Sequence, residues 1–230
     1  MNALRSMLEF CEHKFMTAIG DIYFEGFFKP FWFTYNPRPM HLNGDELYDV
    51  IELVMKNKLM PGDILLSRCD KYIDSWLIPG CMTHAGMYVG KNRLGRHTAV
   101  HAIAEGVVEE NVIDFFHTDY LVILRPTMLC IKDRAKAAEK AYSLLGTPYD
   151  FSFRFTDHFC LCCTELVGYS YEQFKNIFKF SMKPRFGRGK TLIADDIMLT
   201  PNLQVVYMNQ MVKRLPVWGE RMKLQEEGKI

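Results

Sequence analysis

Five short runs with the character of β-strands lie between residues 63 and 126, and they limit the possible folds more than any other feature of the sequence. Each run is β-branched or alternates apolar with polar residues, and Gly, Asn, Asp or Pro bounds it, which is typical of short strands joined by turns. The runs cover 63–68, 84–90, 99–104, a short stretch within 106–112, and 120–126. This pattern predicts a small antiparallel sheet.

Helical patterns precede and follow the predicted strands along the sequence. Apolar residues recur at three- and four-residue spacing within 43–58, and the clearest helix lies within 133–150. In that second helix we expect Asp133 to be the N-cap and Gly146 to act as the stop signal. A further helix is expected to open at the cysteine-rich stretch and to run through Gln173. A sheet accompanied by separate helices predicts an α+β fold.

The composition is that of an ordinary folded protein. Of the 230 residues, 49% are hydrophobic and 24% are charged, and the formal net charge of +1 gives no electrostatic reason to expect a nucleic-acid partner. The seven cysteines are odd in number and lack the spacing of a small secreted scaffold, which favours a reducing compartment and hence the cytoplasm. The first residues show neither the apolar region of a signal peptide nor a membrane-spanning run.

We divide the chain into three parts. Residues 1–57 are expected to form an N-terminal extension of helical and aromatic character, 58–215 the main domain, and 216–230 a charged C-terminal tail. Within the extension, residues 22–35 hold eight aromatic residues in fourteen positions. Charged residues and a proline forbid a bilayer span there, so this segment is expected either to pack on the core or to face lipid or substrate.

Three cysteines and two histidines supply the residue types of a thiol enzyme. Residues 160–167 read "CLCCTELV", and a helix that begins at Cys163 would place this thiol where unpaired amides and the helix dipole lower a thiol pKa from about 8.5. His84 and His101 fall in neighbouring predicted strands, so one imidazole can orient the other. Such a set can serve as nucleophile, general base and orienting group.

Each of these residues also has a structural interpretation. His101 fits a buried structural residue, with Glu105 as the alternative orienting group, and Cys160 and Cys162 are typical of core packing. A zinc site that combines His158 with the three cysteines is disfavoured, because zinc ligands usually come as spaced pairs and adjacent helical cysteines point in different directions. Composition and periodicity do not choose among the three cysteines.

Five separated blocks of the sequence resemble one enzyme family in both order and spacing. They read "PGDILLSR", "THAGMYVG", "AVHAIAEGV", "LLGTPYDFSF" and "CCTELV", and they span about residues 58–175. The pattern resembles the circularly permuted branch of the NlpC-type, papain-like cysteine hydrolases, in particular the YiiX-like proteins; five blocks in order are specific, whereas one alone is weak. The resemblance implies a permuted papain-like fold in which a cysteine helix packs against the small sheet.

The resemblance also assigns roles to individual residues. It implies that Cys163, directly before Thr-Glu-Leu, is the nucleophile and that His84 is the general base. The third polar residue falls at His101, where YiiX-like proteins commonly have Glu; a histidine there is similar to ordinary NlpC-type peptidases and to relatives of lecithin:retinol acyltransferase. Tyr149 and Asp150 match a block that lies near the substrate cleft in the family, although Asp150 also fits a turn residue.

These observations predict a cysteine-dependent amide hydrolase that acts through a thioester and needs no metal or organic cofactor. The expected substrate is a small peptide, of which a cell-wall peptide is one version, or a lipid amide, with lipid contact through residues 22–35. Two alternatives stay open. One is a lipid acyltransferase of the lecithin:retinol acyltransferase type, and the other is a non-catalytic member that uses the cleft only for binding.

Overall fold

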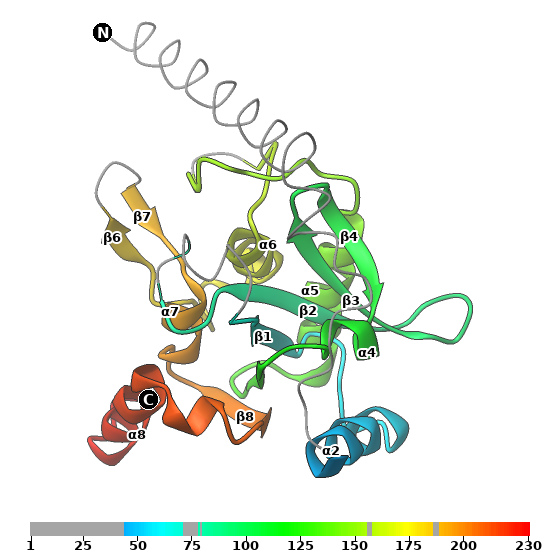
Figure 1. The fold of residues 1–230 in the computed structure, drawn as a ribbon. Coiled ribbons are helices and arrows are strands. Elements are labelled where there is room, and N and C mark those ends of the chain that lie inside the picture. Colours follow the sequence, from blue (N-terminus) through cyan, green and yellow to red (C-terminus); the bar gives the residue numbers. More distant parts are fainter. Residues whose placement is uncertain (1–43, 71–77, 79, 156–157, 186–188) are drawn as a thin grey trace, which may run out of the picture.

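A six-stranded antiparallel sheet lies at the centre of the structure, a computed structural model that describes residues 44–70, 78, 80–155, 158–185 and 189–230. The strand order is β4-β3-β2-β1-β5-β8 (Figure 1). The strands are β1 (Ile64–Arg68), β2 (His84–Lys91), β3 (His97–Ile103), β4 (Gly106–Asn111), β5 (Tyr120–Pro126) and β8 (Leu203–Met208). A separate two-stranded sheet consists of β6 (Lys183–Arg185) and β7 (Gly189–Thr191). The predicted antiparallel sheet is confirmed, and the five predicted runs are β1 to β5.

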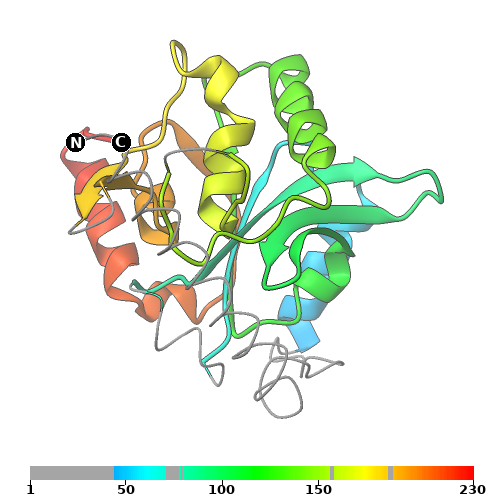
Figure 2. The ribbon, with the colours of Figure 1, turned by 90° about the horizontal axis from the view of Figure 1, so that it is seen from above.

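Helices cover both faces of the sheet. They are α2 (Gly44–Met55), α4 (Val112–Phe115), α5 (Ile131–Ser143), α6 (Cys163–Ser170), α7 (Ala194–Met198) and α8 (Pro216–Glu226), with short 3-10 turns η3 (Glu172–Phe174) and η4 (Val212–Arg214). Apolar residues of α5, α6 and α7 share one core cluster, and those of α2 and α4 share the other. Figure 2 shows α5 and α6 side by side over the same part of the sheet. The α+β class is therefore confirmed.

The central strand β1 shows why the sheet has a core on each face. Ile64 and Leu66 belong to the cluster beneath α5 and α6, whereas Leu65 belongs to the cluster beneath α2. All three side chains are fully buried, because successive residues of a strand point to opposite faces and both faces are covered. Such a strand appears in the sequence as a continuous apolar run.

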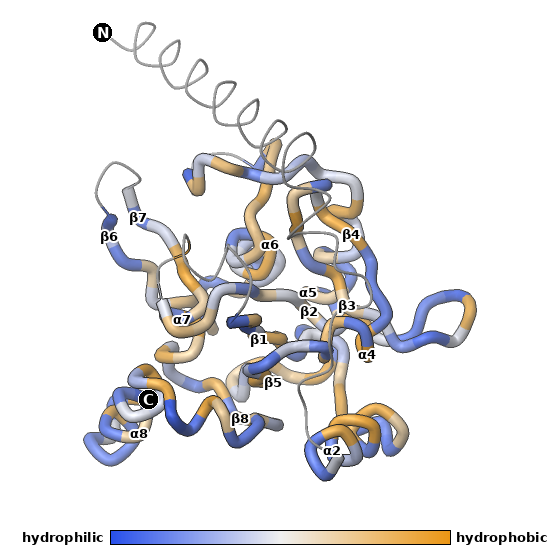
Figure 3. The backbone as a smooth tube through the Cα atoms, in the orientation of Figure 1, coloured by the Kyte–Doolittle hydropathy of each residue, from blue (hydrophilic) through white to orange (hydrophobic). Residues whose placement is uncertain are grey.

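The helix α2 is the described part of the predicted N-terminal extension. Val50, Leu53 and Val54 are buried against the sheet, and hydrophobic and hydrophilic stretches alternate along the helix in Figure 3. The rest of the extension, including the aromatic segment 22–35, lies outside the described residues. None of the helices that the structure describes has the length and apolar character needed to cross a membrane.

The predicted start of α5 differs from the structure, whereas its predicted stop signal does not. The N-cap of α5 is Cys130, three residues before the expected Asp133, and Asp133 lies in the first turn, where its carboxylate accepts a hydrogen bond from the Cys130 thiol at 3.1 Å. A carboxylate in the first turn is also favoured by the helix dipole, so Asp133 does mark the start of the helix, although the N-cap lies three residues earlier. The stop signal is as expected, because α5 ends at Ser143 and Gly146 has a positive φ of 84°.

Residues 216–230, for which the sequence suggests a charged tail, contain the helix α8. Its residues are largely hydrophilic in Figure 3, yet Val217 and Arg221 are buried. The Arg221 guanidinium donates hydrogen bonds to the carbonyl oxygens of Met198 and Leu203. Burial lowers the pKa of Arg221. A charged residue therefore fixes this helix by satisfying carbonyls at the end of α7 and the start of β8.

A buried ion pair joins the turn before β1 to β5. Arg125 donates from Nε to Asp63 Oδ1 at 2.6 Å and from Nη2 to Oδ2 at 2.6 Å, and the backbone amide of Met60 donates to Oδ2 at 2.8 Å. The Asp63 side chain is fully buried. Burial raises the pKa of Asp63, and the bonds to Arg125 oppose that rise. The pair therefore depends on its two-bond geometry to offset desolvation.

We expect Asp63→Asn to lower the free energy of unfolding by about 3 kcal/mol, because it leaves a largely buried guanidinium without its carboxylate. The measurement is the unfolding midpoint in urea. Glu52→Gln is the matched control, because it also removes a carboxylate paired with a cation, Lys56, at 2.9 Å on an exposed helix surface. Equal midpoints for the two variants would show that the Asp63–Arg125 pair stabilises the fold no more than the exposed Glu52–Lys56 pair does.

Candidate active site

Two histidine side chains meet on adjacent strands. His84 is the first residue of β2 and His101 lies within β3, whose register places Gly86 directly opposite His101. Because side chains alternate along a strand, His84 is the diagonal neighbour of His101 on the same face. His84 Nε2 lies 2.8 Å from His101 Nδ1, with the rings edge to face. His101 is fully buried, and His84 is partly exposed.

Space for this pair comes from a glycine and an aromatic ring. Phe115, from α4, packs against both imidazoles, with ring centroids 5.7 Å from His84 and 5.4 Å from His101. A Cβ atom at Gly86 would lie 2.9 Å from the Phe115 ring and 3.2 Å from the His101 Cβ. A side chain at this position would therefore push apart the groups that hold the two imidazoles together.

A carboxylate that the sequence analysis did not identify lies behind His101. Glu110 Oε2 is 3.4 Å from His101 Nε2. Glu110 is on β4, opposite Ala99, so it occupies the face of the sheet that His101 occupies and is the diagonal neighbour of His101. The alternation of "GVVEEN" places Glu110 on one face of its strand, but only the β3–β4 register shows that this position lies beside His101. The alternative orienting residue, Glu105, is exposed in the turn between β3 and β4.

Cys163 is the first residue of α6, and this helix packs against β2 and β3, the strands that carry the histidines (Figure 1). The Cys163 side chain is buried. Thr164, the next residue, donates from Oγ1 to the carbonyl oxygen of Leu192 at 2.7 Å, which fixes the start of the helix. Backbone amides in the first turn of α6 have no partner within the helix, so they favour negative charge nearby.

The other cysteines of the stretch have different surroundings. Cys162 is the N-cap of α6 and is fully buried, with its Sγ 3.5 Å from Thr164 Oγ1. Burial raises the pKa of the Cys162 thiol well above its ordinary value. Cys160 is partly exposed. No disulfide joins the six cysteines of the described residues to one another.

The nearby histidine considered for a zinc site has other neighbours. The His158 ring stacks on Tyr169 with centroids 3.6 Å apart, and its Nδ1 lies 3.5 Å from Oε1 of the buried Glu165. Within the part of the chain that the structure describes, no three His, Cys, Asp or Glu side chains gather in a way that could hold a metal ion.

Tyr149 and Asp150, which the resemblance implied as substrate-binding residues, lie in the loop before α6. Asp150 is buried and closes its own turn: Oδ1 accepts from the Ser152 amide at 2.8 Å and from the Ser152 hydroxyl at 2.6 Å, and Oδ2 accepts from the Arg154 amide at 2.7 Å. These contacts match the turn role that the sequence left open. Tyr149 packs against the ring of Phe151, with centroids 4.9 Å apart.

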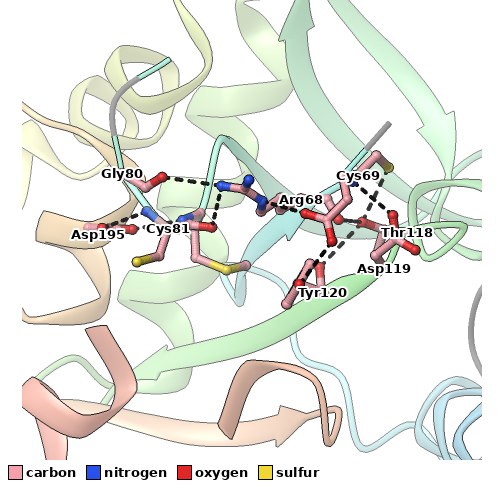
Figure 4. A network of polar contacts seen from close by, with 10 residues as sticks. Arg68, Cys69, Gly80, Cys81, Thr118, Asp119, Tyr120 and Asp195 are labelled. Atoms are coloured by element: carbon pink, nitrogen blue, oxygen red, sulfur yellow. Dashed lines mark hydrogen bonds and ion pairs between the residues drawn. The ribbon is translucent and has the colours of Figure 1, made fainter. Parts of the chain in front are cut away.

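A polar network anchors the backbone that leads into His84 (Figure 4). The Asp195 carboxylate accepts hydrogen bonds from the amides of Cys81 and Met82, each at 2.8 Å. From the end of β1, Arg68 donates to the carbonyl oxygens of Gly80 and Cys81. The approach to the first histidine is thus held from α7 on one side and from β1 on the other.

The comparisons with known proteins concern the family and the fold. A family described as permuted papain-like amidase enzymes, YaeF/YiiX, C92 family, matches residues 58–207. The crystal structure of metalloprotein YiiX from Escherichia coli O157:H7 is similar in fold, with a TM-score of 0.53 and 18% sequence identity, over 65% of this chain and 97% of that one. No curated protein matches the chain.

We expect Gly86→Ala to destabilise the protein by about 1 to 3 kcal/mol, because the new methyl group overpacks the space between Phe115 and His101. Thermal unfolding measures the effect. Gly168→Ala is the control: its Cβ would meet only a Leu192 methyl group at 3.5 Å, an ordinary contact, and alanine is the better helix former. An equally stable Gly86→Ala protein would contradict the packing argument.

We expect Cys162→Ser to lower the free energy of unfolding by about 1 to 3 kcal/mol, because a hydroxyl replaces a fully buried thiol. Alkylation of Cys163 should continue in the folded variant. Cys130→Ser provides the comparison, since it makes the same change at an exposed N-cap position that serine favours. If the folded Cys162→Ser variant is no longer alkylated while the Cys163→Ser variant still is, the nucleophile is Cys162.

Proposed function

Because the chain belongs to the permuted papain-like amidase family, and is therefore a papain-like thiol hydrolase, we propose that it cleaves an amide through a thioester on Cys163. In this proposal His84 is the general base and His101 orients it. The observation that carries the assignment is the 2.8 Å contact between His84 Nε2 and His101 Nδ1 on the strands against which the cysteine helix packs.

The contact between the histidines selects the working nitrogen of His84. Its Nε2 faces His101, so Nδ1 is the ring nitrogen that would take the thiol proton. A base in that role must carry its own proton on Nε2, which means that it donates to His101. Hydrogen-bond donation in the proposed site therefore runs in one direction, from the thiol to His84 and from His84 to His101.

The proposed reaction has two steps. In the first, the Cys163 thiol gives its proton to His84 and the thiolate attacks the amide carbon; the carbon–nitrogen bond then breaks, and the leaving amine takes the proton from His84. In the second, His84 takes a proton from water, the hydroxide attacks the thioester, and the thiolate leaves. Amides at the start of α6 are suited to stabilise the oxyanion in both steps.

The substrate proposal follows from the amidase family and from the sequence of the N-terminal segment. A small peptide, with a cell-wall peptide as one version, suits the amidase family, and we place a lipid amide beside it because of the aromatic segment 22–35. Screening peptidoglycan-type peptides against acyl-lipids separates the two. A lipid acyltransferase remains the second candidate, because a histidine at position 101 is also similar to the lecithin:retinol acyltransferase relatives.

Location and catalytic competence complete the proposal. We propose a reducing, cytoplasmic environment, because the seven cysteines are odd in number and no disulfide joins the six that the structure describes. A thiol-reactive acyl probe separates an enzyme from a binding-only member. If the wild type forms no adduct that Cys163→Ala lacks, the chain uses its cleft only for binding.

We expect His101→Ala to lower the acylation rate of Cys163 by about 10² to 10⁴, because an unoriented imidazole loses its required tautomer. The fold should stay intact, which circular dichroism checks. His101→Glu should recover part of the rate, since a carboxylate also accepts the imidazole N–H and stabilises its cation. If His101→Ala is fully active while Glu105→Ala is inactive, the orienting group is Glu105.

A further inference from the structure

We propose that Glu110 is a positioning residue for catalysis, which acts through His101 to hold His84 in its working tautomer. The inference rests on the proposed function, because it extends the same site by one residue. It adds a carboxylate to the two histidines, so that a line of three side chains runs from β2 through β3 to β4.

The strand register brings Glu110 to His101. β3 pairs with β4 so that Ala99 lies opposite Glu110 and His101 lies opposite Val108. Glu110 is therefore the diagonal partner of His101 on one face, within reach of a long side chain. The separation of 3.4 Å between His101 Nε2 and Glu110 Oε2 is longer than a good hydrogen bond. Such contacts are often loose in structures without ligand and tighten in the reacting complex.

The low exposure of His101 and Glu110 strengthens the influence of the carboxylate on the imidazole. The His101 side chain is 1% exposed, and the Glu110 side chain is 22% exposed. Water therefore has little access to His101 and only partial access to the carboxylate. In such a site the neighbouring protein groups decide which imidazole nitrogen carries the proton.

The proton positions along the line support one arrangement. If Glu110 accepts from His101, the His101 proton is on Nε2 and its Nδ1 must act as an acceptor. His84 then donates from Nε2, which leaves its Nδ1 as the base. The opposite arrangement, with the His101 proton on Nδ1, would make His84 Nε2 the acceptor and place the His84 proton on Nδ1, where it blocks the thiol. An ionised carboxylate has no proton to donate, so one beside His101 Nε2 disfavours that second arrangement.

Two other carboxylates in this region serve as comparisons. Glu109 precedes Glu110, so its side chain points to the other face of β4, where it accepts from Asn92 at 3.1 Å and from Tyr142. Glu105 is exposed in the turn. Of these three carboxylates, Glu110 is the one that the structure brings to His101.

The first test reads the His101 tautomer directly. Long-range ¹H–¹⁵N spectra distinguish protonated from unprotonated ring nitrogens, and among the seven histidines the His101 signals are identified by their loss in His101→Ala. We expect the proton on Nε2 in the wild type and in Glu109→Ala. In Glu110→Ala we expect a mixture of tautomers, and in Glu110→Gln, which keeps an acceptor oxygen, a return toward Nε2.

The second test reads the rate. Peptide mass spectrometry measures the rate at which iodoacetamide alkylates Cys163. We expect this rate to fall by about 10- to 100-fold in Glu110→Ala, which is less than in His101→Ala because Glu110 acts on His84 only through His101. Glu109→Ala should keep the wild-type rate. In the His101→Ala background, Glu110→Ala should cause no further loss, since the residue through which it acts is gone.

The outcomes separate the two proposals. An unchanged His101 tautomer in folded Glu110→Ala would overturn the role of Glu110, and so would a full additional loss of rate in the His101→Ala background. A wild-type Cys163 that reacts no faster than in His84→Ala would instead overturn the proposed function. The tautomer measurement needs neither substrate nor a reactive thiol, so it decides whether Glu110 sets the His101 tautomer even if the proposed function fails.

Discussion

The register between β2 and β3 is the constraint on which the rest of the site depends. It places Gly86 opposite His101, which makes His84 the diagonal neighbour of His101 and brings their ring nitrogens to 2.8 Å. A slip of one residue would turn His101 toward the face that buries Val100. The bare backbone at Gly86 leaves room for Phe115, which packs against both rings. Backbone pairing therefore sets side-chain chemistry.

Buried and partly buried charged side chains hold the connections around this sheet. Asp63 and Arg125 tie the turn before β1 to β5, and Arg221 ties α8 to the end of α7. Asp195 does the same for the backbone before His84 by accepting from two successive amides. Each of these groups has partners that offset the cost of its burial, and each satisfies backbone or side-chain groups that would otherwise lack a partner. The segments that carry the site are thus fixed from outside the strands themselves.

An imidazole between a base and a carboxylate makes the proton positions depend on one another. A carboxylate directly beside His84 would need only to accept one proton. With His101 in between, Glu110 must accept a hydrogen bond from one His101 nitrogen while His84 donates one to the other, because a neutral imidazole has one donor nitrogen and one acceptor nitrogen. The proposed site therefore depends on three strands, whereas a site with a carboxylate at position 101 would depend on two.

The sequence by itself determined the strands β1 to β5, the helices α2, α5 and α6, and the residue types of the site, because alternation, helical spacing and turn residues are local signals. It also placed Cys163 at a helix start and the two histidines on neighbouring strands. Only the tertiary structure decided that Glu110 reaches His101, that Asp195 holds the amides of residues more than 100 positions earlier, and that Arg221 is buried. The physical reason is that a polar side chain shows its type in the sequence, whereas its partner depends on register and on the packing of elements far apart along the chain.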